Sequence, residues 1–285
     1  MSQDIIDLSR DYSLGGMNRR GFLDRLAQLA GGAAAALALL PVLEGHQEYK
    51  PLVPADDKSL TTETVQYDGG DAKISAYLAR QKGASKRPAV IVIHENRGLT
   101  PHIEDVARRL AREGFLALAP DMLSPLGGTP KDQDKAPKMI GSLEQDKTVA
   151  RLAAAVKFLA SHPESNGKVG VTGFCWGGAM VNRVMASGAD LKAGVAYYGS
   201  VLPDAGVPKI SGPLMLHYAG TDARINAGIP GFEAALKANK KTYEKFVYEG
   251  AQHAFNNDSN PARYNKEAAE LAWGRTVAFF KKYLA

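Results

Sequence analysis

A cysteine flanked by glycines is the feature of this sequence that points most clearly to chemistry. Cys175 is the centre of residues 173–178, Gly-Phe-Cys-Trp-Gly-Gly, a nucleophile motif that more often carries serine. Residues 168–172 before it predict a short buried strand, and residues 179–185 after it predict a helix. A sharp turn between the two would hold the thiol at a helix N-terminus, where the helix dipole favours the reactive thiolate. A buried core cysteine beside packing glycines is the alternative.

Two further polar residues follow this cysteine at places that suit catalysis. Asp222 comes just after the apolar stretch 214–218, and His253 comes just after the stretch 244–248. Both stretches predict strands, and open α/β sheets place their sites at the carboxyl ends of strands. Taken singly, Asp222 is more typical of a turn and His253 of a loop histidine. The order nucleophile, acid, histidine is that of α/β-hydrolases and favours a catalytic triad.

The remaining elements predict one sheet that would position these residues. Residues 64–67 and 73–79 predict an antiparallel hairpin, because they flank an Asp-Gly-Gly turn. The other predicted strands are 89–94, 115–119, 168–172, 193–198, 214–218 and 244–248, and the helices are 103–112, 148–161, 179–185, 232–239 and 266–283. We therefore predict an α/β-hydrolase fold over residues 46–285, with a mostly parallel eight-stranded sheet and helices on both faces. Residues 124–141 predict a long irregular loop that would form a wall of the site.

The first 45 residues have a different character. Arg19 and Arg20 precede a stretch from Leu26 to Leu43 that is rich in alanine and leucine. Paired arginines before a mildly apolar stretch are typical of a twin-arginine (Tat) export signal, and this stretch is too short and too alanine-rich for a membrane span. Such a signal predicts a periplasmic or exported protein that uses the Tat translocase. The alternative is a cytoplasmic protein whose retained N-terminal helical arm docks on the domain.

Composition excludes several other classes of function. The net charge is +5, and no basic stripe is interleaved with aromatic residues, so nucleic acid is not an expected partner. A single cysteine rules out an intrachain disulfide. The six histidines show no metal-ligand spacing, and no phosphate loop or dinucleotide fingerprint occurs, so we expect neither a metal nor a cofactor. The sequence leaves the oligomeric state open.

Several motifs of this chain occur together in one known family. They are His-Glu-Asn-Arg-Gly at 94–98, Ala-Pro-Asp at 119–121, the cysteine motif at 173–178, Asp222, and His-Ala-Phe at 253–255. With these motifs, the sequence resembles the dienelactone hydrolase family from about Thr64 to Ala285. A cysteine in this motif, combined with a glutamate just after the third strand, sets the family apart from the serine esterases.

The resemblance implies both a site and an activity. It implies that Cys175 is the nucleophile, that His253 is the base and that Asp222 orients it. It also implies that Glu95 takes the thiol proton when substrate arrives. The family's substrate is a small molecule, a cyclic enol-lactone that carries a carboxylate and is opened to a dicarboxylic acid.

The residues themselves indicate a reaction that proceeds through a thioester on Cys175. Attack of the Cys175 thiolate on a lactone or ester carbonyl would form a tetrahedral oxyanion. The backbone N–H of Trp176 and one from the Glu95–Asn96 turn would bind that oxyanion, and water assisted by the histidine would then hydrolyse the thioester. Glu95 has an alternative role as a strand-end carboxylate held by local N–H groups or by Arg97.

The sequence departs from the founding members of the family at the substrate carboxylate. Those enzymes carry one arginine soon after Ala-Pro-Asp and another four residues past the histidine. Here residues 122–125 read Met-Leu-Ser-Pro, and the second position is Asn257. Arg97, Arg224 and Arg263 are candidates for a replacement cation. We therefore expect neutral lactones or esters to react at least as well as carboxylate-bearing ones, unless one of these arginines reaches the pocket.

Two other functions fit the same residues. A thioesterase or acyltransferase on the same scaffold would need a long apolar channel for the acyl chain. A non-catalytic binding or redox-sensing protein would need only the reactive thiol. The pairing of Asp222 with His253 argues against a sensor, because a sensor thiol needs no oriented base.

Overall fold

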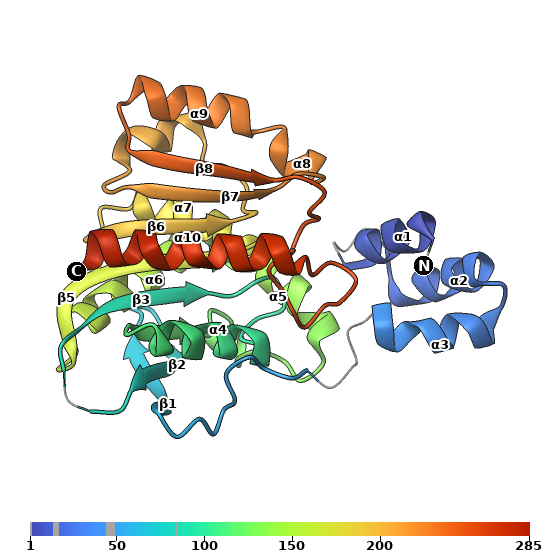
Figure 1. The fold of residues 1–285 in the computed structure, drawn as a ribbon, viewed down its shortest axis with the longest axis horizontal. Coiled ribbons are helices and arrows are strands. Elements are labelled where there is room, and N and C mark those ends of the chain that lie inside the picture. The colour runs from blue at the N-terminus through green and yellow to red at the C-terminus, as the bar shows by residue number, and fades with distance from the viewer. Residues whose placement is uncertain (1, 14–16, 44–48, 84) are drawn as a thin grey trace.

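Within the part of the chain that the structure describes, eight strands form one sheet in the order β1-β2-β4-β3-β5-β6-β7-β8 (Figure 1). The structure is a computed structural model and describes residues 2–13, 17–43, 49–83 and 85–285. The strands are β1 (Leu60–Asp68), β2 (Lys73–Gln81), β3 (Arg87–Ile93), β4 (Leu116–Pro120), β5 (Ser165–Phe174), β6 (Leu191–Tyr197), β7 (Leu214–Ala219) and β8 (Tyr243–Tyr248). β2 is antiparallel to both of its neighbours, and all other pairs are parallel. The predicted α/β fold with a mostly parallel sheet is confirmed.

Helices cover both faces of this sheet, as the sequence predicts. One face is covered by α4 (Pro101–Arg112) and α10 (Lys266–Leu284). The other face is covered by α6 (Gln145–Ala160), α7 (Trp176–Met185) and α9 (Ile229–Ala238). Each face has its own apolar core.

The alternation of side chains along β3 feeds both cores. Val90 and Val92 belong to the core under α4 and α10, whereas Ile91 and Ile93 belong to the core under α6, α7 and α9. Successive side chains of a strand point to opposite faces, so a strand covered on both sides reads as a continuous apolar run. This is why residues 89–94 are recognisable as a central strand in the sequence.

The segment 124–141, predicted as an irregular loop, is partly helical, so that prediction is wrong in detail. Its Ala136 and Ile140 are buried with Leu123 in a small separate core. The helix that carries them has only six residues, too few for a helical period to stand out in the sequence. The unpredicted helical segments are Ser124–Leu126, Gln133–Lys135, α5 (Ala136–Gly141), Asp204–Lys209 and α8 (Ala223–Asn226).

The N-terminal region forms three helices, α1 (Gln3–Ser13), α2 (Arg19–Ala30) and α3 (Ala33–Leu43), which lie to one side of the sheet in Figure 1. No described helix is by itself long and apolar enough to cross a membrane, and α2 passes that test only together with residues 33–40, at a bend of 112°. Export through the Tat route stays a prediction. The predicted boundary between residues 45 and 46 lies outside the described residues.

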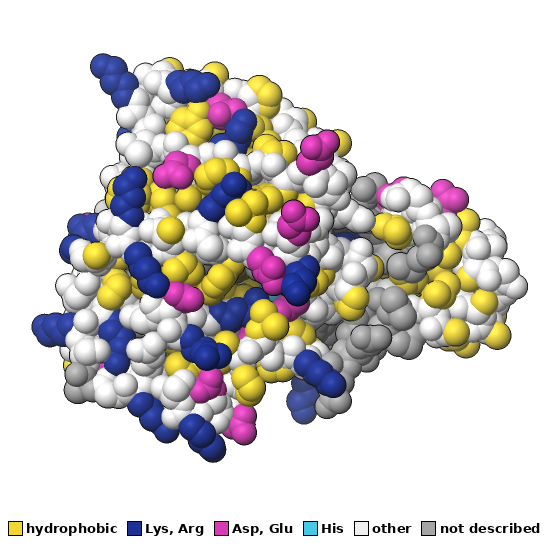
Figure 2. All heavy atoms as spheres, in the orientation of Figure 1, with side chains coloured by type: hydrophobic (Ala, Val, Ile, Leu, Met, Phe, Trp, Pro, Cys, Tyr) yellow, Lys and Arg dark blue, Asp and Glu magenta, His cyan; other side chains and the backbone are white. Residues whose placement is uncertain are grey.

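Charged side chains are mixed on the visible surface. Figure 2 shows Lys and Arg scattered among Asp and Glu over this face of the molecule. A basic stripe, which nucleic-acid binding requires, is not seen on the face shown.

Helix α7 begins directly against the sheet because its first turn contains two glycines. A Cβ at Gly177 would lie 2.4 Å from the carbonyl oxygen of Ile93, and one at Gly178 would lie 2.5 Å from that of Tyr197. Real Cβ atoms do not approach backbone oxygens so closely. The glycines therefore let the N-terminus of α7 fit between the carboxyl ends of β3 and β6.

We expect Gly177→Ala to lower the free energy of unfolding by about 2 kcal/mol or more, because the added methyl group meets backbone that cannot move aside. Gly274→Ala is the matched control, since Gly274 lies in α10 with no atom within 4 Å of its Cβ position. That control should stabilise the protein by up to about 1 kcal/mol through helix propensity. Urea denaturation measures both values, and equal effects would show that α7 can shift away from β3.

Candidate active site

The turn at Cys175 holds its backbone in a conformation that residues other than glycine rarely adopt. β5 ends at Phe174 and α7 begins at Trp176, so one residue makes the whole turn. Cys175 has a φ of 55° and a ψ of −114°, and its N–H donates to the carbonyl oxygen of Tyr197 at 3.0 Å. Strain of this kind persists only where the surrounding structure enforces it. As the first residue of α7, Trp176 has a backbone N–H without an acceptor inside the helix.

His253 and Asp222, predicted to act together, are in contact. The Nδ1 atom of His253 lies 2.5 Å from Oδ2 of Asp222, and both side chains are buried. Asp222 follows β7 and caps α8, accepting the N–H of Ile225 on its other oxygen. His253 follows β8, and the next residue, Ala254, has a φ of 67°. The two residues therefore come together at the carboxyl end of the sheet, as the strand-end rule predicts.

The charges around His253 favour its protonated form. Burial lowers the pKa of His253, but the nearby Cys175 and the hydrogen bond with Asp222 outweigh it and raise the pKa to about 10. Burial raises the pKa of Asp222, but the hydrogen bond and charge of His253 hold it below its usual range. The Nε2 atom of His253 is buried and has no hydrogen-bond partner among the described residues. An imidazole fixed through Nδ1 and free at Nε2 can exchange a proton with a group in the site.

Glu95 is held by two hydrogen bonds that the sequence did not predict. Tyr198 donates its hydroxyl to Oε1 at 3.3 Å, and Asn257 donates its Nδ2 to Oε2 at 2.6 Å. Burial raises the pKa of Tyr198 well above its usual value, and Glu95 raises it further, so the phenol remains a donor. Arg97, the predicted local partner of Glu95, pairs with Asp134 instead.

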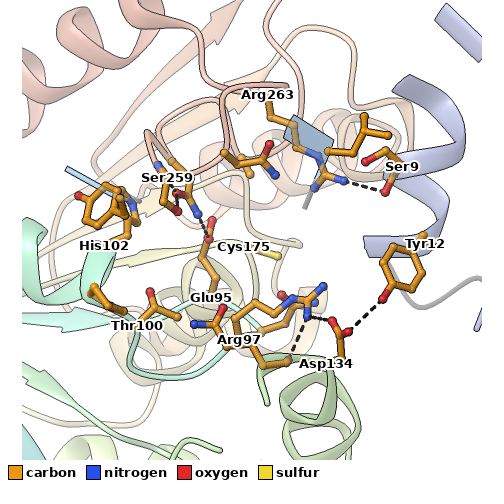
Figure 3. Close-up of a pocket in the computed structure, with 18 of the residues that line it drawn as sticks. Ser9, Tyr12, Glu95, Arg97, Thr100, His102, Asp134, Cys175, Ser259 and Arg263 are labelled. Atoms are coloured by element: carbon orange, nitrogen blue, oxygen red, sulfur yellow. Dashed lines mark hydrogen bonds and ion pairs between the residues drawn. The ribbon is translucent and has the colours of Figure 1, made fainter. Parts of the chain in front are cut away.

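One cavity of about 510 Å³ collects most of the predicted site residues (Figure 3). Those that line it are Glu95, Asn96, Arg97, Cys175, His253, Asn257 and Arg263. Asp222 is not a lining residue and acts on the cavity through His253. Trp176, a predicted oxyanion residue, is not among the lining residues, and its ring stacks on that of His94 with centroids 5.3 Å apart. Arg224 is exposed on α8 and does not line the cavity.

Of the three arginines proposed from the sequence, Arg97 and Arg263 line the cavity, and both have partners. Arg97 donates from Nη1 to Oδ1 of Asp134 at 2.7 Å and to the carbonyl oxygen of Gln133 at 3.0 Å. Arg263 donates from Nη2 to the carbonyl oxygen of Ser9 at 3.5 Å. Figure 3 shows both contacts on the same side of the cavity. The cavity therefore carries positive charge that is already engaged by the protein.

Sequence patterns missed several residues of this site. Tyr198 follows β6 and has a φ of 38°, and its ring lies 5.0 Å from that of His253. Its position at a strand end is the signal that could have found it. His102, a further lining residue, has its Nδ1 2.8 Å from Oδ1 of Asp258. These two residues are 156 positions apart, and nothing in the sequence connects them.

The described residues contain no group of three or more histidine, cysteine or acidic side chains placed to hold a metal ion. The chemistry available to this cavity from its own side chains is that of a thiol, an imidazole and carboxylates. A strained thiol beside an oriented imidazole is the arrangement of a covalent nucleophile.

We expect the pKa of His253 to fall when Cys175 is replaced by alanine, because Cys175 is the largest influence that raises it. The pKa of His253 is higher in the folded protein than its ordinary value of 6.5, so protonation of His253 stabilises the fold. This stabilisation is complete at pH values below 6.5. This contribution is lost as the pH rises towards about 10, and the variant should lose it at lower pH. NMR titration of the imidazole nitrogens measures the pKa, and an unchanged value would contradict the proposed coupling.

Known proteins show the same fold and related sequence. The sequence profile of the Dienelactone hydrolase family matches residues 74–284. The chain is 34% identical over 256 residues to "Putative carboxymethylenebutenolidase" of Saccharolobus solfataricus. The aligned region covers 76% of this chain and 97% of that protein. It is 30% identical over 247 residues to "Probable 2-oxo-3-(5-oxofuran-2-ylidene)propanoate lactonase" of Bradyrhizobium sp, with 79% and 98% covered.

A solved structure agrees with these relatives. The crystal structure titled "Putative Dienelactone Hydrolase" from Klebsiella pneumoniae superposes with a TM-score of 0.73 and 30% sequence identity. The match covers 79% of this chain and all of that one. Because the profile spans most of the sheet and its helices, and the relatives match over nearly their full length, this chain belongs to the dienelactone hydrolase family of hydrolases.

Proposed function

We propose that this hydrolase opens small lactones or esters through a covalent intermediate on Cys175, with His253 as base and Asp222 as the group that orients it. The observation that carries the proposal is the state of His253. Its Nδ1 is fixed by Asp222 at 2.5 Å, while its Nε2 is unpartnered beside a thiol held in a strained turn. His102 is held by Asp258 in the same way and also has an unpartnered Nε2, so the nearness of Cys175, which raises the pKa of the imidazole, is what distinguishes His253.

The proposed reaction has two steps. In the first, the thiol proton passes to Glu95, the sulfur of Cys175 attacks the substrate carbonyl, the C–O bond of the ester or lactone breaks, and protonated His253 gives its proton to the expelled oxygen. The backbone N–H of Trp176 and one from the Asn96 turn would stabilise the oxyanion that forms on the way. In the second step, His253 takes a proton from water, the hydroxide attacks the thioester, the C–S bond breaks, and the proton held by Glu95 returns to the sulfur of Cys175.

We propose that Glu95 receives the thiol proton when substrate binds. Tyr198 and Asn257 both donate to its carboxylate, so neutral donors hold this group at the cavity that Cys175 also lines. In the present state these donors hold both oxygens of Glu95, so the side chain must exchange one of them to reach the thiol. Asn257 thus positions Glu95, at the place where the sequence suggested a contact with the substrate.

The size and polarity of the cavity favour a small polar substrate. A volume of about 510 Å³ suits a lactone, and most lining residues are polar or charged. This lining gives no support to a long acyl chain, the substrate of a thioesterase or acyltransferase. The expectation that neutral substrates react at least as well as carboxylate-bearing ones held only if no candidate arginine reached the pocket. Arg97 and Arg263 both line it. We propose that carboxylate-bearing lactones are included among the substrates, with one of these arginines as the cation.

We expect Cys175→Ala to lower kcat/KM for lactones and esters by roughly three orders of magnitude or more, since the covalent route is lost. The panel should include a dienelactone and its methyl ester. The variant should keep the native fold, as circular dichroism would show, because a single small side chain is removed. Alkylation of wild-type protein with iodoacetamide is the parallel control and should abolish the same activity. A variant that kept near wild-type rates would refute the assignment of Cys175.

We expect Glu95→Gln to slow acylation by about 10- to 100-fold, because the amide cannot accept the thiol proton. Deacylation should be unaffected, since it depends on His253. Glu244→Gln is the control, since Glu244 is exposed on β8 and loses the same charge far from the cavity. Single-turnover kinetics separate the two steps. Unchanged acylation in Glu95→Gln would return Glu95 to a structural role.

A further inference from the structure

The three N-terminal helices form a folded unit around an apolar core of their own. We call α1, α2 and α3 the N-terminal unit. Phe22 and Leu26 of α2 are fully buried, and the ring of Tyr12 stacks on Phe22 at 4.4 Å. Among the described residues, this core contains side chains of the N-terminal unit alone. Asn18 caps α2 by accepting the N–H of Gly21. The unit is therefore a structured body rather than a trailing segment.

Polar contacts dock the N-terminal unit on two loops of the hydrolase domain. Asp134, in the segment after β4, accepts hydrogen bonds from Tyr12 at 3.0 Å and from Arg19 at 3.4 Å. On the loop after His253, Arg263 donates to the backbone of Ser9. Figure 3 shows both contacts at one side of the cavity, with α1 lying across the space between them.

The docked unit takes part in the cavity that contains the thiol. Ser9, Tyr12, Arg19 and Leu43 line it together with Cys175. We propose that the N-terminal unit is a wall of this cavity that limits the size of the molecules reaching Cys175. The proposal concerns access to the thiol and does not depend on the hydrolytic role of Cys175.

The character of the dock makes this wall movable. Among the described residues the unit shares no apolar core with the domain, and its contacts include an ion pair between half-exposed side chains, 52% for Arg19 and 40% for Asp134. Exposed pairs of this kind contribute little stability, and segments held by few buried apolar contacts open most readily. A small molecule can therefore pass the closed wall, whereas a large one must wait for the unit to move.

The single cysteine of the chain makes access directly measurable, because any maleimide adduct reports Cys175. The full-length protein is treated with N-ethylmaleimide or with fluorescein maleimide, which carry the same reactive group at different sizes. Intact-mass spectrometry gives the two rates, and their ratio cancels changes in thiol reactivity. The test variant is Tyr12→Phe/Arg19→Gln, which removes both contacts to Asp134 but keeps an aromatic ring on Phe22.

We expect wild type to react much faster with the small reagent than with the large one. In the double variant, the rate with the large reagent should rise about 3- to 10-fold relative to the small one, as expected from the loss of two exposed contacts. Arg20→Gln is the control, because it removes the same charge from the next residue of α2, which is exposed and does not line the cavity. It should leave the ratio unchanged.

Two results would overturn the proposal. One is a ratio that is the same in wild type and the double variant, including the case in which the large reagent reacts with neither. The other is an equal rise in Arg20→Gln, which would indicate a general effect of charge on an anionic reagent. Loss of hydrolysis in Cys175→Ala has no bearing on either result, so failure of the wall and failure of the proposed function are distinguishable.

Discussion

The turn at Cys175 is the constraint on which the site depends. A single residue with a φ of 55° connects β5 to α7, and the helix can start there only because Gly177 leaves room for the backbone of β3. The same turn points the thiol towards the carboxyl ends of the parallel strands and leaves the N–H of Trp176 without an acceptor in the helix. The proposed nucleophile and the proposed oxyanion donor thus come from one local geometry. The remaining groups need only to be carried there by neighbouring strands.

Electrostatic balance then decides how these groups can act. Asp222 holds His253, and the charge near Cys175 raises the pKa of that imidazole to about 10. Acylation of Cys175 removes the largest influence that raises the pKa of this imidazole. His253 would then be a better base in the step where water must be activated. Glu95, which accepts hydrogen bonds from Tyr198 and Asn257, is the proposed acceptor for the first proton.

Much of this arrangement is predictable from the sequence, for physical reasons. Strands covered on both faces read as apolar runs, as at residues 89–94, and the strand-end rule selects Cys175, Asp222 and His253. The hydrogen bond from Asn257 to Glu95 was not predictable, because it joins residues 162 positions apart. Docking of an N-terminal helical arm on the domain was one alternative from the sequence, but its contacts with Asp134 and Arg263 were not predictable, since sequence patterns report a helix and not the loop that it contacts.

A covalent intermediate at Cys175 is the central step of the proposed reaction, and that species can be observed. Rapid-quench mass spectrometry during turnover of an aryl acetate should detect one acetyl group on the peptide that contains Cys175, formed and consumed at rates that match hydrolysis. Glu95→Gln should slow its formation. Hydrolysis that proceeds with no acyl group on Cys175, or with one on another side chain, would contradict the account.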